Sequence, residues 1–131
     1  MTARPPLQRI LLVEDDPDIQ TVAGLALTRI GGFTVEICGT AREAFGRAPA
    51  FRPDLIILDV MMPGMDGVSA LKALREIPET MTTPVVFMTA RAQAQDLALY
   101  KEMGSLGVIA KPFEPMTLAD TLRGLWNPHG E

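Results

Sequence analysis

The sequence predicts one α/β domain, a doubly wound (βα)5 fold in which helices cover both faces of a five-stranded parallel sheet. Five short apolar runs alternate with amphipathic segments along 131 residues, a length that suits a single domain. Several runs are apolar at successive positions, which is typical of strands buried on both sides. The chain has no internal repeat, low-complexity block or linker. We therefore predict a domain over residues 9–127, with tails at 1–8 and 128–131.

The first strand is predicted at residues 10–13 and is followed by the first helix. Pro17 suits the first helical position, and apolar residues recur at helical spacing as far as Ile30. Asp16 is placed to cap this helix, and the pair Gly31-Gly32 stops it.

The second strand is predicted at residues 35–37. Thr40 and Glu43 after it have the spacing of a capping box and indicate the start of a short helix. We expect this helix to end before Pro49. Cys38 is interpreted as a small apolar residue at the strand end.

The third strand is predicted at residues 55–58, before a helix that Asp66 caps and whose apolar stripe begins at Val68. The fourth strand, 85–88, precedes a helix from about Ala92 to Met103 that ends at Gly104. The fifth strand, 107–110, precedes a helix that Pro115 opens and whose apolar stripe ends at Trp126.

The composition excludes several classes of protein. Hydrophobic residues make up 47% of the chain and charged residues 21%, which is typical of a globular domain and not of a disordered chain. One cysteine leaves no disulfide framework and favours a reducing compartment, so we expect a cytoplasmic protein. No apolar run approaches the ~20 residues of a membrane span. The net charge of -4 argues against a grip on nucleic-acid phosphates.

Polar residues end most of the predicted strands, and the carboxyl ends of these strands are where such sheets bind ligands. The residues in question are Glu14, Asp15, Asp16, Asp59, Thr89 and Lys111. Neighbouring carboxylates repel one another, and Mg²⁺ removes that conflict because it binds carboxylates, waters and phosphate oxygens. A lysine adds a point charge for a phosphate. The set therefore predicts phosphoryl transfer onto a carboxylate.

Four segments, in the right order and each after the right strand, resemble the receiver domains of two-component response regulators. The segments are Leu12–Asp16, Leu58–Gly67, Met88–Ala90 and Lys111–Phe113. The resemblance covers almost the whole chain. Within this family the sequence is similar to the single-domain chemotaxis regulators. It implies a flavodoxin-like three-layer sandwich with the strand order 2-1-3-4-5.

The resemblance also implies the roles of the acidic residues. Asp59 is expected to be the phosphoacceptor, which attacks the phosphoryl group of a phosphohistidine to form an acyl phosphate. Mg²⁺ is the expected cofactor, held directly by Asp15, through water by Glu14, and by Asp59 and the backbone carbonyl of Met61. Asp16 falls one place too far along the chain to be a ligand.

The remaining roles belong to the last two strands. Thr89 is expected to be the switch hydroxyl that turns toward the phosphoryl group, and Lys111 the ion-pairing lysine. A cis peptide before Pro112 would hold Lys111 in place. The family usually has Tyr or Phe three residues before the lysine, and this ring moves inward with the threonine. Val108 stands there and cannot make the same movement, which leaves open how a signal reaches the face formed by the fourth helix, fifth strand and fifth helix.

We expect a phosphorylation-dependent switch that accepts a phosphoryl group from a histidine kinase or histidine phosphotransfer protein and acts on a protein target through that face. It would catalyse only its own phosphorylation and slow dephosphorylation, as a monomer or weak dimer with no nucleic acid or membrane partner. Alternatives are a phosphate sink, an interaction module that is never phosphorylated, and a receiver excised from a larger regulator or hybrid kinase. An aspartate-dependent phosphohydrolase is disfavoured because Asp59-Val60-Met61 lacks the second acid that such enzymes generally show.

Overall fold

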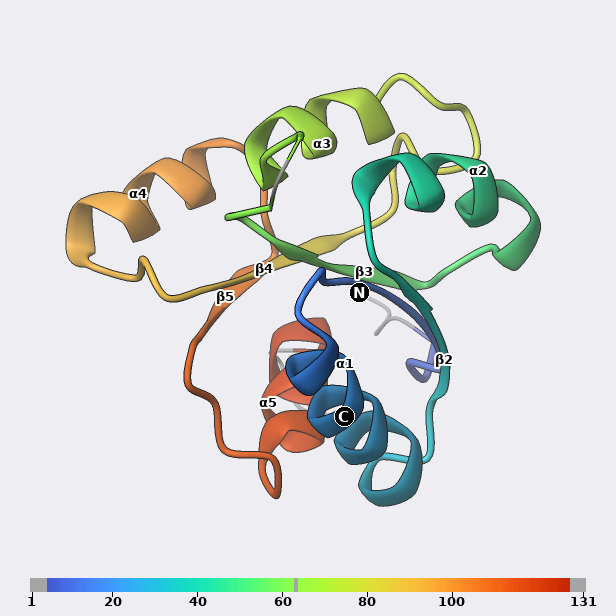
Figure 1. Cartoon of the computed structure of the whole chain (residues 1–131), viewed down its shortest axis with the longest axis vertical. Coiled ribbons are helices and arrows are strands. Elements are labelled where there is room, and N and C mark those ends of the chain that lie inside the picture. Colours follow the sequence, from blue (N-terminus) through green and yellow to red (C-terminus); the bar gives the residue numbers. More distant parts are fainter. Residues whose placement is uncertain (1–4, 63, 128–131) are drawn as a thin grey trace.

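The chain folds around a five-stranded parallel sheet with the strand order β2-β1-β3-β4-β5, in a computed structural model that describes residues 5–62 and 64–127 (Figure 1). The strands are β1 (Arg9–Val13), β2 (Thr34–Cys38), β3 (Leu55–Asp59), β4 (Val85–Thr89) and β5 (Gly107–Ala110). Each strand contains its predicted apolar run. The predicted fold class and strand order are therefore confirmed.

Helices cover the sheet on both faces, as Figure 1 shows. One face carries α2 (Ala41–Phe51), α3 (Gly67–Leu74) and α4 (Ala94–Glu102), and the other carries α1 (Pro17–Leu25), its π-helical continuation η1 (Ala26–Ile30) and α5 (Leu118–Trp126). The buried side chains accordingly form two hydrophobic clusters, one on each face. Along β3, Ile56 and Leu58 belong to the first cluster, and Leu55 and Ile57 belong to the second, as the alternation of a strand requires.

The helix caps predicted from the sequence are present. The Asp16 carboxylate accepts a hydrogen bond from the amide of Asp18 at 2.8 Å, and that of Asp66 accepts one from Ser69 at 2.7 Å. The Thr40 hydroxyl accepts one from the amide of Glu43 at 3.1 Å. These side chains satisfy backbone donors that the first turn of a helix leaves without a partner.

The prediction that the second helix ends before Pro49 is wrong, because α2 continues through this proline to Phe51. Pro49 has no N–H to donate to the preceding turn. Packing compensates for the lost bond, since Ala48 and Phe51 are both buried in the cluster on this face. The guanidinium of Arg9 also lies 4.2 Å from the centre of the Phe51 ring and donates to its carbonyl at 2.8 Å.

The other helices differ from the predictions only near their ends. The first helix continues from Ala26 as a π-helical turn, in which the amide of Gly31 donates a hydrogen bond to the Ala26 carbonyl at 3.0 Å. The fourth helix begins at Ala94, and the fifth begins at Leu118, after a turn that includes Pro115.

The segment before β1 packs against the last helix. Leu7 is buried in the cluster on the α1 and α5 face, and the indole N–H of Trp126 donates to the Pro5 carbonyl at 2.7 Å. The tail predicted at 128–131, which contains His129, lies outside the described residues. In the part of the chain that the structure describes, no helix has the length and apolar character needed to cross a membrane.

Candidate functional site

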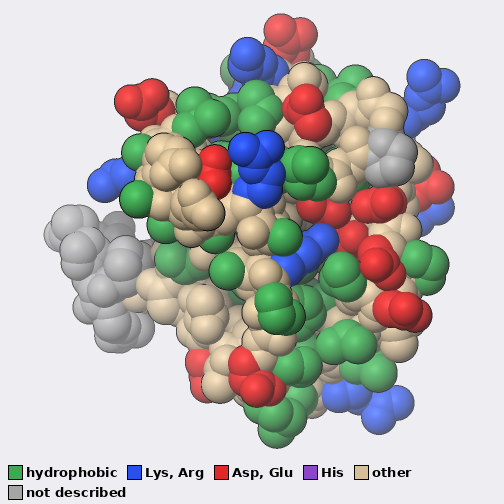
Figure 2. Space-filling model, turned by 60° about the vertical axis from the view of Figure 1, so that its left-hand side comes forward, with side chains coloured by type: hydrophobic (Ala, Val, Ile, Leu, Met, Phe, Trp, Pro, Cys, Tyr) green, Lys and Arg blue, Asp and Glu red, His purple; other side chains and the backbone are tan. Residues whose placement is uncertain are grey.

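Three carboxylates meet at the carboxyl edge of the sheet. Asp59 is the last residue of β3, and Glu14 and Asp15 directly follow the neighbouring strand β1. Each offers an oxygen atom, and these atoms all lie within 4.8 Å of one another. Glu14 and Asp59 are buried, and Asp15 is the most exposed of the three. Figure 2 shows acidic side chains gathered on this side of the molecule.

Lys111 reaches this acidic cluster from β5. Its ammonium nitrogen Nζ lies 2.7 Å from Oε1 of Glu14 and 3.2 Å from Oδ2 of Asp59. The Lys111 amide donates to the Thr89 carbonyl at 2.9 Å, which extends the pairing of β5 with β4 to the site. The peptide bond between Lys111 and Pro112 is cis, as the family resemblance implies.

Burial dominates the electrostatics of Asp59 and raises the pKa of its carboxyl from 3.8 to about 6. The Met61 amide, which donates to Oδ1 at 3.0 Å, lowers this pKa, the charge of Glu14 raises it, and the charge of Lys111 lowers it. For Lys111, burial alone would lower the pKa, but its hydrogen bond to Glu14 and the charge of Asp59 raise it above its usual value. Lys111 is therefore held as a cation beside a carboxyl that is costly to ionise.

Thr89 ends β4 and is fully buried. Its hydroxyl oxygen accepts a hydrogen bond from the Arg91 amide at 2.9 Å. Its strand lies next to β3, with Asp59 paired with Met88. The predicted switch hydroxyl is therefore at the same edge as the carboxylates, in contact with the segment that leads to α4.

The donor set fits a hard divalent cation. Three carboxylate groups face one ammonium group, so the cluster is short of positive charge, and oxygen ligands are those that Mg²⁺ prefers. Glu14, Asp15 and Asp59 could therefore hold such an ion. That the Met61 carbonyl joins them stays a prediction.

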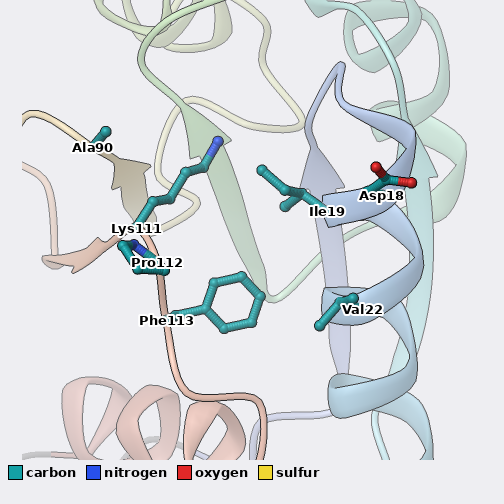
Figure 3. A pocket seen from close by; sticks show the side chains of 7 residues that line it. All are labelled: Asp18, Ile19, Val22, Ala90, Lys111, Pro112 and Phe113. Carbon is teal, nitrogen blue, oxygen red and sulfur yellow. The ribbon is translucent and has the colours of Figure 1, made fainter.

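An apolar pocket of about 410 Å³ lies beside the acidic cluster. Its lining consists of Asp18, Ile19, Val22, Ala90, Lys111, Pro112 and Phe113. Figure 3 shows Ile19 and Val22 of α1 on one side and the ring of Phe113 on the other. Lys111 belongs to both the pocket and the charged cluster, so the two adjoin.

Sequence reasoning missed how Glu14 is held. Its Oε2 accepts a hydrogen bond from the Asp16 amide at 3.0 Å, and its carbonyl accepts one from the side chain of Gln20 at 2.6 Å. Both bonds join a side chain to the backbone, and such pairs leave no pattern of residue types in a sequence. Val108 stands where the family resemblance implies an aromatic ring, and it packs in the same cluster as Phe87, its partner in the neighbouring strand.

The model of the response regulator receiver domain matches residues 10–123 of the chain. The chain belongs to this family. The receiver domain is 35% identical over 116 residues to the DNA-binding response regulator MtrA of Mycolicibacterium smegmatis, a match that covers 88% of this chain and 49% of that protein. It is 36% identical over 121 residues to the transcriptional regulatory protein CseB of Streptomyces coelicolor, covering 92% of this chain and 50% of that protein. The chain thus spans about half the length of these curated relatives.

Solved structures agree with this assignment over nearly their full length. The chemotaxis protein CheY4 of Vibrio cholerae has a TM-score of 0.83 and 32% identity, with 92% of this chain and 99% of that chain covered. The receiver domain of the sensor histidine kinase PA1611 of Pseudomonas aeruginosa has a TM-score of 0.78 and 31% identity, with 92% and 98% covered. That structure has a magnesium ion coordinated in its active-site cleft. This chain is therefore a signalling domain whose acidic cluster could bind a metal.

Proposed function

We propose that this receiver domain accepts a phosphoryl group on Asp59 from the phosphohistidine of a histidine kinase or histidine phosphotransfer protein, in a reaction that needs Mg²⁺. One observation carries the proposal. The buried Asp59 carboxylate lies within 4.8 Å of two other carboxylates and 3.2 Å from the Lys111 ammonium group. A nucleophilic carboxylate, a cation site and a fixed positive charge are what phosphoryl transfer requires.

The transfer itself is a substitution at phosphorus. An Asp59 carboxylate oxygen forms the new bond to phosphorus, the bond between phosphorus and the histidine nitrogen breaks, and its electron pair leaves with the imidazole. Asp59 must be ionised to attack, and the charge of Lys111 favours that form. Mg²⁺ held by Glu14, Asp15, Asp59 and the Met61 carbonyl would neutralise charge on the phosphoryl oxygens. The histidine-bearing partner would approach over the apolar pocket, where the site adjoins open surface.

Lys111 and Thr89 supply the remaining contacts of the proposed product. The Lys111 ammonium group already faces Asp59 and would pair with a phosphoryl oxygen attached there. The Thr89 hydroxyl can donate to another. The new charge would thereby change the packing of β4, β5 and α4, and a protein target would read this change on the face formed by α4, β5 and α5.

The test is incubation with acetyl phosphate and Mg²⁺ followed by measurement of the intact mass. We expect one added phosphoryl group, its loss in Asp59→Asn, and its loss when a chelator removes Mg²⁺. Asp120→Asn is the matched control, because Asp120 is an exposed carboxylate on α5, away from the acidic cluster, and this variant should be phosphorylated like the wild type. An unchanged mass of folded wild-type protein would contradict the proposal.

Other results would favour the alternative functions. Catalytic turnover of a small phosphate monoester that depends on Asp59 would indicate a phosphohydrolase. Partner binding that neither acetyl phosphate nor Asp59→Asn alters would indicate an interaction module that is never phosphorylated. A phosphoryl group that is accepted and lost without any change on the face of α4, β5 and α5 would indicate a phosphate sink.

A further inference from the structure

The peptide groups of Arg91 are bound on both sides. Its N–H donates to the Thr89 hydroxyl at 2.9 Å, and its carbonyl accepts a hydrogen bond from the hydroxyl of Tyr100 at 3.1 Å. Thr89 is the strand end beside Asp59, and Tyr100 lies on α4. One residue of the connecting segment therefore links Thr89, at the end of the strand next to that of Asp59, to this helix through two hydrogen bonds.

Tyr100 is the residue that anchors α4 in the core. It is 3% exposed and is the only buried residue among the nine of this helix. Its ring centre lies 5.1 Å from that of Phe87, with an angle of 51° between the rings. Phe87 is paired with Val108, and all three side chains pack in the same cluster. The aromatic ring that packs against Phe87 and Val108 is therefore that of Tyr100, which belongs to α4.

The hydroxyl of the buried Tyr100 has the Arg91 carbonyl as its hydrogen-bond partner. A buried hydroxyl without a hydrogen bond is costly, so the position of the Arg91 carbonyl and that of the Tyr100 ring depend on each other. If the carbonyl moves, the ring must follow it or lose its bond. Because the ring anchors α4, either outcome changes how firmly this helix is held.

We propose that Tyr100 couples the state of Asp59 to the position of α4 through the backbone of Arg91, an inference that rests on the proposed function. A phosphoryl group on Asp59 offers the Thr89 hydroxyl a charged acceptor, which binds it more strongly than a neutral group does. A Thr89 hydroxyl that turns toward Asp59 turns away from the Arg91 amide. The segment that contains Arg91 then shifts. Either the Tyr100 ring moves with the Arg91 carbonyl, or the hydrogen bond between them breaks.

Two reporters in the chain allow a direct test by NMR. The Met61 amide donates to Asp59 and so reports whether the site is occupied. Tyr100 is the one tyrosine of the sequence, so a ¹³C-tyrosine label gives signals from this ring alone. The probe is Mg²⁺ with beryllofluoride, which is a stable analogue of a phosphoryl group. In the wild type we expect the Met61 amide, the Tyr100 ring and the amides of α4 all to shift.

Tyr100→Phe removes the hydroxyl and keeps the ring, so the tilted ring contact with Phe87 remains. In this variant the Met61 amide should respond as before, while the population of the shifted α4 state changes by about fivefold, the usual effect of one hydrogen bond. Arg91→Ala is the matched control, because the proposed link uses only the backbone of this residue and its α4 response should equal that of the wild type.

The possible results distinguish failure of the proposed coupling through Tyr100 from failure of the proposed phosphoacceptor function of Asp59. Equal α4 responses in Tyr100→Phe and the wild type would overturn the coupling and leave the phosphoacceptor function standing. A wild-type Tyr100 ring that stays unchanged while the Met61 amide shifts would do the same. A wild-type Met61 amide that does not respond would overturn the proposed function, and the coupling with it.

Discussion

Lys111 is shared between two buried carboxylates, and it lies closer to Glu14 than to Asp59. Each also accepts a hydrogen bond from one backbone amide at 3.0 Å, that of Asp16 for Glu14 and that of Met61 for Asp59. The two carboxylates therefore differ in their distance to Lys111, and Asp59 is the one that the ammonium group engages less closely. This is consistent with a group that is meant to react, because a carboxylate fully engaged by a cation is a poor nucleophile.

The raised pKa of Asp59 predicts how stability depends on pH in the metal-free protein. The carboxyl has a pKa of about 6 in the folded state against an ordinary value of 3.8, so the folded state binds its proton more tightly. The stability that this proton provides is complete below pH of about 4 and is lost as the pH rises through about 6. Asp59→Asn, which keeps the neutral form, should then be more stable than the wild type at neutral pH by about 2 to 3 kcal/mol.

Chemical denaturation at a series of pH values in the presence of chelator measures this difference. The gap between Asp59→Asn and the wild type should open between pH of about 4 and about 6. Asp120→Asn serves as the control, since it makes the same chemical change at an exposed carboxylate on α5. A constant difference for Asp59→Asn over the same range would show that this carboxyl is not perturbed.

At the scale of elements, the start of α3 lies close to the backbone at the end of β3. The Gly67 amide donates to the Val60 carbonyl at 2.8 Å, and α3 begins at this residue. A Cβ atom at Gly67 would lie 2.6 Å from the carbonyl oxygen of Asp59 and 2.7 Å from Cα of Val60. Because these are backbone atoms of Asp59 and its neighbour, a side chain there must displace the site or the helix.

Gly67→Ala should therefore lower the free energy of unfolding by about 1 to 3 kcal/mol, the usual cost of overpacking. Denaturant titration measures this loss, and the chemical shift of the Met61 amide measures the disturbance at Asp59. Gly46→Ala is the matched control, because a Cβ atom at Gly46 meets nothing within 4 Å and alanine favours the helix α2. That substitution should leave stability equal or raise it by about 1 kcal/mol. Equal effects of the two substitutions would argue against the close approach at Gly67.

The sequence predicts elements best where one physical signal dominates. The successive apolar residues of the strands and the cap of α1 by Asp16 each follow from local chemistry, and the structure has them. Pro49 was misread because tertiary packing of Phe51 outweighs the local effect of a proline. The π-helical turn that begins at Ala26 has no comparable local signal.

The candidate site divides in the same way. The acids and Lys111 could be placed from the ends of the predicted strands, since parallel strands bring their carboxyl ends to one edge. The bridge from Thr89 through Arg91 to Tyr100 could not, because it runs through backbone atoms that every residue possesses. Residue types show where charge and hydrophobicity lie along the chain, but they do not show which backbone carbonyl a side-chain hydroxyl will bind.

For the molecule as a whole, Cys38 offers a measure of opening. It is the one cysteine of the sequence, it is fully buried at the end of β2, and burial raises the pKa of its thiol to about 11. Its carbonyl accepts a hydrogen bond from the Glu14 amide at 2.9 Å, so the segment that carries the acidic cluster is attached to it. A reagent can reach this thiol only when the fold opens around it.

We predict that a thiol reagent modifies Cys38 at least about a thousandfold more slowly in the folded protein than in the unfolded chain, because the reaction waits for opening. The absorbance of the released reagent group gives the rate. Mg²⁺ should slow the reaction further, since an ion that binds the folded state suppresses its opening. An added cysteine at the exposed position of Thr82 should react at once and shows that the reagent is active. Rapid modification of Cys38 in native protein would contradict its burial.

The order of the strands has a consequence for how the chain is made. β2 pairs on one side of β1, and on the other side β3, β4 and β5 follow in the order in which they are synthesised. Lys111 follows the last strand, so it is the final charged member of the cluster to leave the ribosome. Until then a nascent chain carries Glu14, Asp15 and Asp59 without their lysine. The addition of the last strand therefore completes the sheet and brings Lys111 to the acidic cluster in one event.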